Sequence, residues 1–115
     1  MDKETFKARI LRLAKDRPGL SFAEIERFIP ECEGTKAIGP KNEFGEIFYW
    51  FGLNDEFLDA LGDLVKAGDI EYDPTPALTY LIDGRVPNVP VMTRVPRKPF
   101  KKAKWLPVVI NLKKK

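Results

Sequence analysis

The stretch between residues 54 and 82 constrains the fold most, because it reads as a helix, a glycine stop and two short strands. Asn54 is a favourable N-cap, and Gly68 lies just past the last turn, where a C-cap glycine is common. Gly62 is unfavourable inside a helix, which indicates close packing of another backbone. The apolar stripe of this helix recurs at helical spacing and consists of Phe57, Leu58, Leu61, Leu64 and Val65.

Two segments with alternating apolar residues follow this helix. Ile70 and Tyr72 alternate with acidic residues in the first segment, and Leu78, Tyr80 and Ile82 alternate in the second. The residues between them contain two prolines, which suit a loop and exclude the interior of a ladder. The pattern therefore predicts a β-hairpin over residues 70–82.

The helix, the glycine and the predicted hairpin together resemble the second half of a winged helix-turn-helix domain. The residues that carry this resemblance are Leu58, Leu61, Leu64, Val65, Gly68, Ile70, Tyr80 and Leu81. The resemblance implies an α+β, winged-helix-like domain with three helices and a small antiparallel sheet. The chain also resembles short uncharacterised proteins of phages and pathogenicity islands, a resemblance that implies no function.

The first half of the chain predicts two more helices. Residues 3–16 form an amphipathic helix with Asp2 as N-cap, and its basic face is either solvated or in contact with a DNA backbone. Ser21 opens a capping box for a second helix over residues 21–29. Residues 31–45 are polar and glycine-rich and predict a loop.

The aromatic run over residues 47–51 has two interpretations. Five consecutive apolar or aromatic residues predict a strand that is buried on both faces. We expect this strand to pair with the hairpin of residues 70–82. The alternative is an exposed aromatic surface that meets a protein partner or stacked bases.

Charge divides the chain into two parts. Residues 1–84 hold 10 Lys and Arg against 17 Asp and Glu, whereas residues 85–115 hold 10 Lys and Arg and no acid. We therefore expect a winged-helix-like domain over residues 1–84 and a basic, proline-rich extension over residues 85–115 that is partly docked on it. The apolar run of residues 106–112 is the segment expected to form a last strand or to dock.

The basic extension is the predicted nucleic-acid-binding element. Lys and Arg neutralise phosphates, and aromatic rings stack on bases. A basic extension beside an acidic body is alternatively explained by packing on that body. The candidate residues are Arg94, Arg97, Lys98, Phe100, Lys101, Lys102, Lys104 and Trp105.

The helix that resembles a recognition helix lacks the charge to approach DNA. Residues 54–67 carry four acids and one lysine, and the predicted hairpin loop has no Lys or Arg. The sequence therefore leaves two functions open. The first is a non-enzymatic, nucleic-acid-binding accessory or regulatory protein of DNA or RNA. The second is a protein–protein interaction module, including a homodimer, with an acidic body and no direct DNA contact.

Composition argues against enzymatic chemistry. The chain has no histidine and one cysteine, Cys32, so no Cys/His zinc site and no internal disulfide are expected. It has no glycine-rich phosphate-binding motif. We expect no catalytic residues, no metal site and no cofactor. The absence of an apolar run near 18 residues predicts no membrane span, and the single cysteine suits the cytoplasm.

Overall fold

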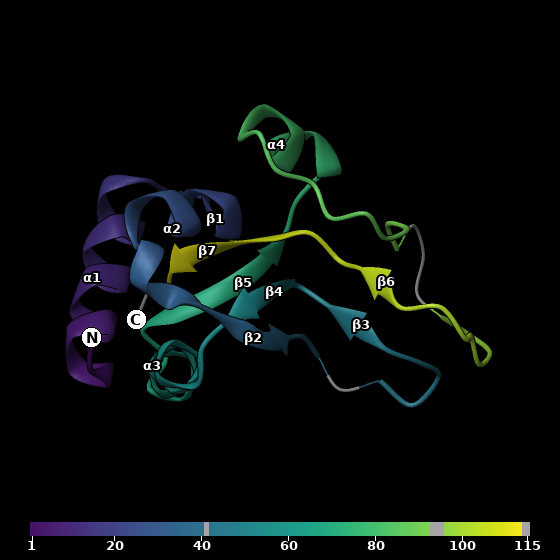
Figure 1. Cartoon of the computed structure of the whole chain (residues 1–115), viewed down its shortest axis with the longest axis horizontal. Coiled ribbons are helices and arrows are strands. Elements are labelled where there is room, and N and C mark those ends of the chain that lie inside the picture. Colours follow the sequence, from purple (N-terminus) through teal and green to yellow (C-terminus); the bar gives the residue numbers. More distant parts are fainter. Residues whose placement is uncertain (41, 93–95, 114–115) are drawn as a thin grey trace.

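The protein has an α+β fold (Figure 1). The structure is a computed structural model that describes residues 1–40, 42–92 and 96–113. Helices and short strands are interspersed along the whole chain, so the predicted fold class is confirmed at this level. The elements are α1 (Lys3–Asp16), β1 (Leu20–Ser21), α2 (Phe22–Phe28), the 3-10 turn η1 (Pro30–Cys32), β2 (Glu33–Ile38), β3 (Ile47–Phe48), β4 (Trp50–Leu53), α3 (Asp55–Lys66), β5 (Ile70–Pro74), α4 (Ala77–Ile82), β6 (Lys104–Trp105) and β7 (Val108–Leu112).

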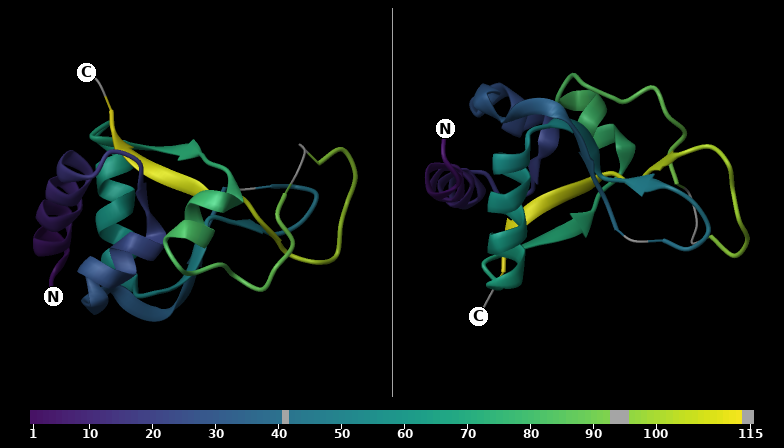
Figure 2. Two further views of the ribbon diagram at one scale, coloured as in Figure 1. Left: turned by 90° about the horizontal axis from the view of Figure 1, so that it is seen from above. Right: turned by 60° about the horizontal axis from the view of Figure 1, so that its bottom comes forward.

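The three predicted helices begin where their capping residues require. Asp2 accepts a hydrogen bond from the Thr5 amide at 2.8 Å, and Asn54 accepts one from the Phe57 amide at 2.9 Å. Ser21 forms the complete capping box with Glu24. Helices α1 and α3 lie against each other, with the rings of Phe6 and Phe57 in edge contact at 5.2 Å (Figure 2). These helices are local features, which is why the sequence predicts them.

The main sheet is antiparallel, and its middle strand comes from the C-terminal part of the chain. β7 lies between β1 and β5, so Ile110 pairs with Leu20 on one side and with Tyr72 on the other. Val108 and Ile110 are buried in the core. Residues 108–112 therefore belong to the same sheet as β1 and β5, which lie within residues 1–84.

The predicted hairpin over residues 70–82 is wrong. β5 forms as expected, but Ala77–Ile82 is the helix α4. β7 pairs with β5 in place of the expected second strand, and the Thr75 amide donates to the Pro107 carbonyl at 3.0 Å. Pro76 is the N-cap residue of α4 and has an extended backbone, with φ -63° and ψ 148°. Helical geometry buries Tyr80 and leaves Leu78 and Ile82 outside.

Two predictions for residues 31–51 also need correction. Glu33–Ile38 is a strand within the predicted loop, and it pairs with β4. The aromatic run is divided into β3 and β4, neither of which pairs with β5. Instead β3 runs parallel to β6, with Phe48 opposite Trp105. Strand partners are set by contacts far apart in the sequence, which a local pattern does not contain.

The aromatic run is mainly core. Ile47, Phe48 and Trp50 are buried, and Trp50 stacks on Tyr80 with ring centroids 5.1 Å apart. Trp50 also donates its indole N–H to Glu26 at 3.1 Å. This burial supports the core interpretation of residues 47–51.

Among the described residues, no helix is long and apolar enough to cross a membrane.

Candidate nucleic-acid interface

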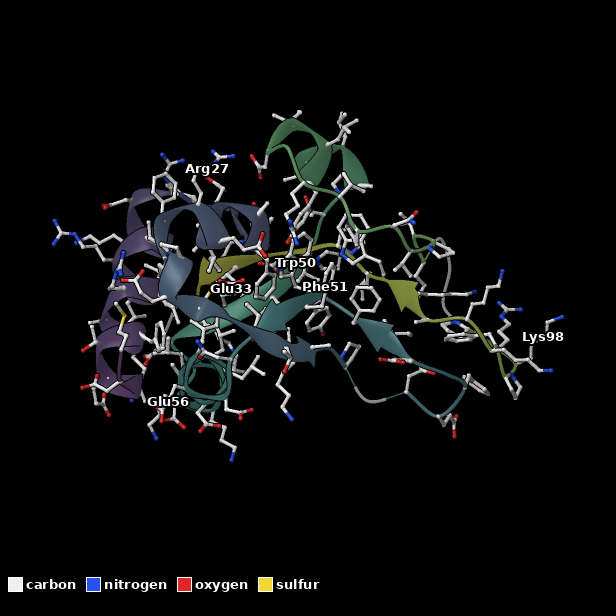
Figure 3. The ribbon with its side chains drawn as sticks, viewed as in Figure 1. Arg27, Glu33, Trp50, Phe51, Glu56 and Lys98 are labelled. Carbon is white, nitrogen blue, oxygen red and sulfur yellow. The ribbon has the colours of Figure 1, made fainter. Side chains whose placement is uncertain are left out.

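The described cations of the candidate set lie together at one end of the molecule. We call residues 96–104 the basic arm; it contains Arg97, Lys98, Lys101, Lys102 and Lys104. The first four are exposed and Lys104 is half-buried. Figure 3 shows Lys98 at the far end of the longest axis, well away from Glu56 on α3. Arg94 is outside the described residues.

Backbone hydrogen bonds brace the basic arm against residues 42–48. The Phe100 amide donates to the Phe44 carbonyl at 2.8 Å, and the Lys104 amide donates to the Glu46 carbonyl at 3.0 Å. The parallel pairing of β3 with β6 continues this contact into the core. The loop that carries the cations is therefore held by backbone hydrogen bonds at Phe100 and Lys104 and by the strand pairing of β6.

Phe100 packs within the arm. A Cβ atom built on Gly45 would lie 2.5–2.7 Å from three carbons of the Phe100 ring, so the glycine makes room for the ring. The Lys104 ammonium lies 4.7 Å from the centroid of the same ring. The ring is thus in contact with Gly45 and Lys104.

Trp105 belongs to the core and not to the interface. Its side chain has no exposed surface, and its indole N–H donates to the Tyr49 carbonyl at 3.0 Å. The ring also makes an edge contact with Tyr80 at 5.1 Å. The expectation that Trp105 stacks on bases is therefore wrong, because β6 pairs with β3 and this residue is fully buried in the core.

Ion pairs neutralise many cations of the body. Lys3 pairs with Asp63 at 3.0 Å, and Arg9 pairs with Glu31 at 3.0 Å. The hydrogen bond from Lys3 lowers the pKa of the Asp63 carboxyl. The basic face of α1 is therefore largely paired with acids of the body. This finding supports the solvated-face interpretation for Lys3 and Arg9.

The basic arm differs from the body in this respect. Within residues 1–40, 42–92 and 96–113, five ion pairs join two residues of the body, a sixth joins Arg85 of the extension to Glu26, and none includes an arm cation. The residues outside these ranges include no acid. The extension packs on the body through β6, β7 and Arg85, but the arm cations have no acidic partner among the described residues.

The helix α3 presents acids and not cations. Phe57, Leu61 and Leu64 are buried against the rest of the core. Asp55, Glu56 and Asp59 remain on the exposed side of the helix, so phosphates would be repelled there. The exposed side of α3 is therefore unsuited to binding phosphates.

Other polar groups are used to hold the fold. An open groove of about 540 Å³ between α1 and the main sheet is lined partly by Asp73 and Asn111. The side chain of Asn111 bridges Asp73 and Gly19. Its amide N–H donates to the Asp73 carboxylate at 2.8 Å, and its oxygen accepts from the Gly19 amide at 2.7 Å. Among the described residues, no group of three His, Cys, Asp or Glu side chains is placed to hold a metal ion.

An apolar stripe on α4 is the surface feature that the sequence reasoning missed. Leu78, Leu81 and Ile82 are 59%, 65% and 75% exposed. They stand at positions i, i+3 and i+4, which is one face of a helix. This spacing, together with Pro76 before it, was the available signal for a helix with an unpartnered apolar face.

Comparison of the chain with protein-family models, with curated protein sequences and with solved structures finds no match.

Proposed function

We propose that this protein is a non-enzymatic, nucleic-acid-binding accessory or regulatory protein that contacts phosphates through the basic arm. The observation that carries this proposal is the set of arm cations that project from one end of the molecule outside every ion pair of the described residues. Phosphate neutralisation by such cations supplies sequence-independent affinity. The single buried thiol of Cys32 fits a place in the cytoplasm.

We also propose that the fold is of winged-helix type, with a wing that differs from the predicted one. The support is the order of α1, β1, α2, α3, β5 and β7 along the chain, with β2, β3 and β4 inserted before α3, and the antiparallel pairing of β5 with β7. The connection between these two strands runs from residue 75 to residue 107 and contains the basic arm. In this proposal the wing is the long connection between β5 and β7, and it carries the cations that residues 73–77 lack.

Binding of a labelled DNA duplex across a salt series tests the proposed function. The variant Arg97→Gln/Lys98→Gln/Lys101→Gln/Lys102→Gln removes the four exposed arm cations. We expect the log of the affinity to fall linearly with log salt, with a slope less steep by up to about 3–4 in the variant. Equal affinities and slopes for the two proteins would overturn the assignment to the arm, and no binding at low salt would overturn nucleic-acid binding altogether.

A matched control separates the arm from overall charge. Arg12→Gln/Lys15→Gln/Lys36→Gln/Lys66→Gln removes the same number of exposed cations from α1, β2 and α3, none of which is in an ion pair with a described residue. We expect this control to keep most of the affinity and of the salt slope. A loss equal to that of the arm variant would show that net charge, not the arm, drives binding.

The α4 stripe favours a second candidate function, self-association. Residues 74–82 contain no Asp, Glu, Lys or Arg, so two copies can meet there without opposing like charges. Tyr80 fixes the helix to the core through hydrogen bonds to Phe22 and Val108. This stripe replaces the buried residues 47–51 as the surface of a homodimer.

Light scattering at high protein concentration tests self-association without nucleic acid. We expect wild-type protein at twice the chain mass and Leu81→Lys/Ile82→Lys at the chain mass. Val65→Lys, at a 39% exposed apolar residue on α3, is the control and should remain a dimer. A monomeric wild type rejects this second candidate and leaves the first untouched.

A further inference from the structure

The aromatic rings near the basic arm are already engaged with the protein. Proteins that bind single strands combine a basic groove with exposed rings on which bases stack. Trp105 is fully buried and hydrogen-bonded to the Tyr49 carbonyl. Phe100 lies against Gly45, with Lys104 over its ring. The arm therefore offers its charges to a ligand, but its rings are used for packing.

Apart from Phe44, which is half-buried, the other rings in this half of the molecule contact one another. Tyr49 lies 5.0 Å from Tyr72 between ring centroids, and Phe51 makes an edge contact with Phe48 at 5.9 Å. All 13 aromatic residues lie within the described ranges, and each of them is buried or half-buried. The six residues outside those ranges carry no ring.

The cations of the arm are presented on a restrained backbone. Pro96 and Pro99 fix two φ angles within the arm, and the Phe100 amide is held by the Phe44 carbonyl. Fixed cations suit phosphates that are themselves fixed in space. A duplex presents such phosphates at about one charge per 1.7 Å of axis, roughly twice the density of one strand.

We infer that the basic arm binds the phosphate backbone of double-stranded nucleic acid, without base stacking and without reading sequence. This inference rests on the proposed function and adds the class of ligand. Three observations support it. The rings are packed against the protein, and the cations lie on a backbone held by hydrogen bonds. The exposed side of α3 is acidic, which keeps that helix away from the bases. Contacts limited to phosphates position a protein but do not specify a site.

Three labelled probes of one length test the inference on the full chain: a DNA duplex, one of its strands, and that strand with most bases removed as abasic sites. We expect the duplex to bind at least about fivefold more tightly than the single strand. The intact and abasic strands should agree within twofold, since each stacked base would contribute roughly five- to hundredfold. A second duplex of unrelated sequence should bind like the first.

Different outcomes identify which claim fails. Tighter binding of the single strand, or a loss of tenfold or more on removing its bases, overturns the duplex inference while the proposed function stands. A strong preference between the two duplexes overturns it as well. If no probe binds at low salt, the duplex inference and the proposed function are both overturned, whereas the other outcomes overturn the inference alone.

A pair of variants gives an independent check on the ring. Phe100→Leu keeps an apolar side chain over Gly45 but removes the ring, and we expect its duplex affinity to stay within twofold of wild type. Lys101→Gln/Lys102→Gln should lose about tenfold or more at low salt, with a salt slope less steep by about 2. Circular dichroism establishes that both variants fold. A loss in Phe100→Leu equal to that of the lysine variant would show that the ring contacts the ligand and overturn the inference.

Discussion

The hydroxyl group of Tyr80 donates a hydrogen bond to the backbone carbonyl of Val108 at 2.6 Å. The same hydroxyl accepts one from the Phe22 amide at 3.0 Å. Tyr80 therefore joins α4 to the start of α2 and to the middle strand of the main sheet. Burial raises the pKa of this phenol, which stays protonated and able to donate at neutral pH.

Tyr80→Phe should destabilise the protein by about 1–3 kcal/mol, because it leaves a buried amide and a buried carbonyl without their partner. Chemical denaturation at neutral pH measures this change. Tyr72→Phe is the control, since the Tyr72 hydroxyl makes no hydrogen bond to a described residue and should change stability by less than about 0.5 kcal/mol. Equal effects of the two substitutions would contradict the bridging role of Tyr80.

Ile110→Ala should destabilise the protein by about 2–4 kcal/mol, because it removes a fully buried side chain from the middle strand. Leu112→Ala in the same strand should cost less than about 1 kcal/mol, since Leu112 is 40% exposed. Thermal or urea unfolding compares them. If both variants were as stable as wild type, β7 would not be part of the core.

Gly62→Ala should stabilise the protein by about 0.5–1 kcal/mol. A Cβ atom at Gly62 meets nothing within 4 Å, and alanine favours the helix over glycine. The close packing expected at Gly62 from the sequence is therefore wrong. Unfolding curves give the size of the gain.

Gly68→Ala is the matched comparison, because a Cβ there also meets open space but the backbone has φ +75°. Alanine is strained in that conformation, so the variant should lose about 1 kcal/mol. A gain at Gly68, or a loss at Gly62, would contradict the backbone conformations described for α3 and its C-cap.

The thiol of Cys32 should make stability fall at alkaline pH. Burial, followed by the nearby Glu26 carboxylate, raises the pKa of this thiol from 9.0 to about 11. Above pH 9 the unfolded chain loses the proton that the folded chain keeps, so stability decreases as pH rises from 9 to 11. At pH 10 this contribution is about 1 kcal/mol.

Comparing wild type with Cys32→Ala isolates that contribution, since the variant lacks the titrating group. The difference in unfolding free energy between the two proteins should shrink as pH rises from 8 to 11. A difference that stays constant over this range would show that the thiol titrates normally in the folded protein.

The sequence predicts α1, α2 and α3 well because each is specified by its own caps and stripe. Asp2, Ser21 and Asn54 act within three residues of themselves, so no distant part of the chain is needed to place them. The strands are different. Residues 78–82 alternate well enough for a strand, but β5 pairs with β7 and the segment is helical.

The same distinction applies to the candidate interface. Composition alone identifies the exposed cations Arg97, Lys98, Lys101 and Lys102, because a run of like charges without acids is unfavourable anywhere except at the surface. It does not separate Trp105 from Phe100, since both lie close to cations in the chain. Their difference comes from β6 and from Gly45, which lie in another part of the sequence.

The pairing of Ile110 with Leu20 has a consequence for how the protein is made. The first strand of the main sheet has no neighbour until a segment about ninety residues later has been synthesised and has left the ribosome, and pairings this distant are slow to form. During synthesis, the helices can form while the sheet still lacks its middle strand. The basic arm precedes β7 in the chain, and the segment that braces it, residues 42–48, is made earlier still, so the contacts of the arm can form before the sheet closes.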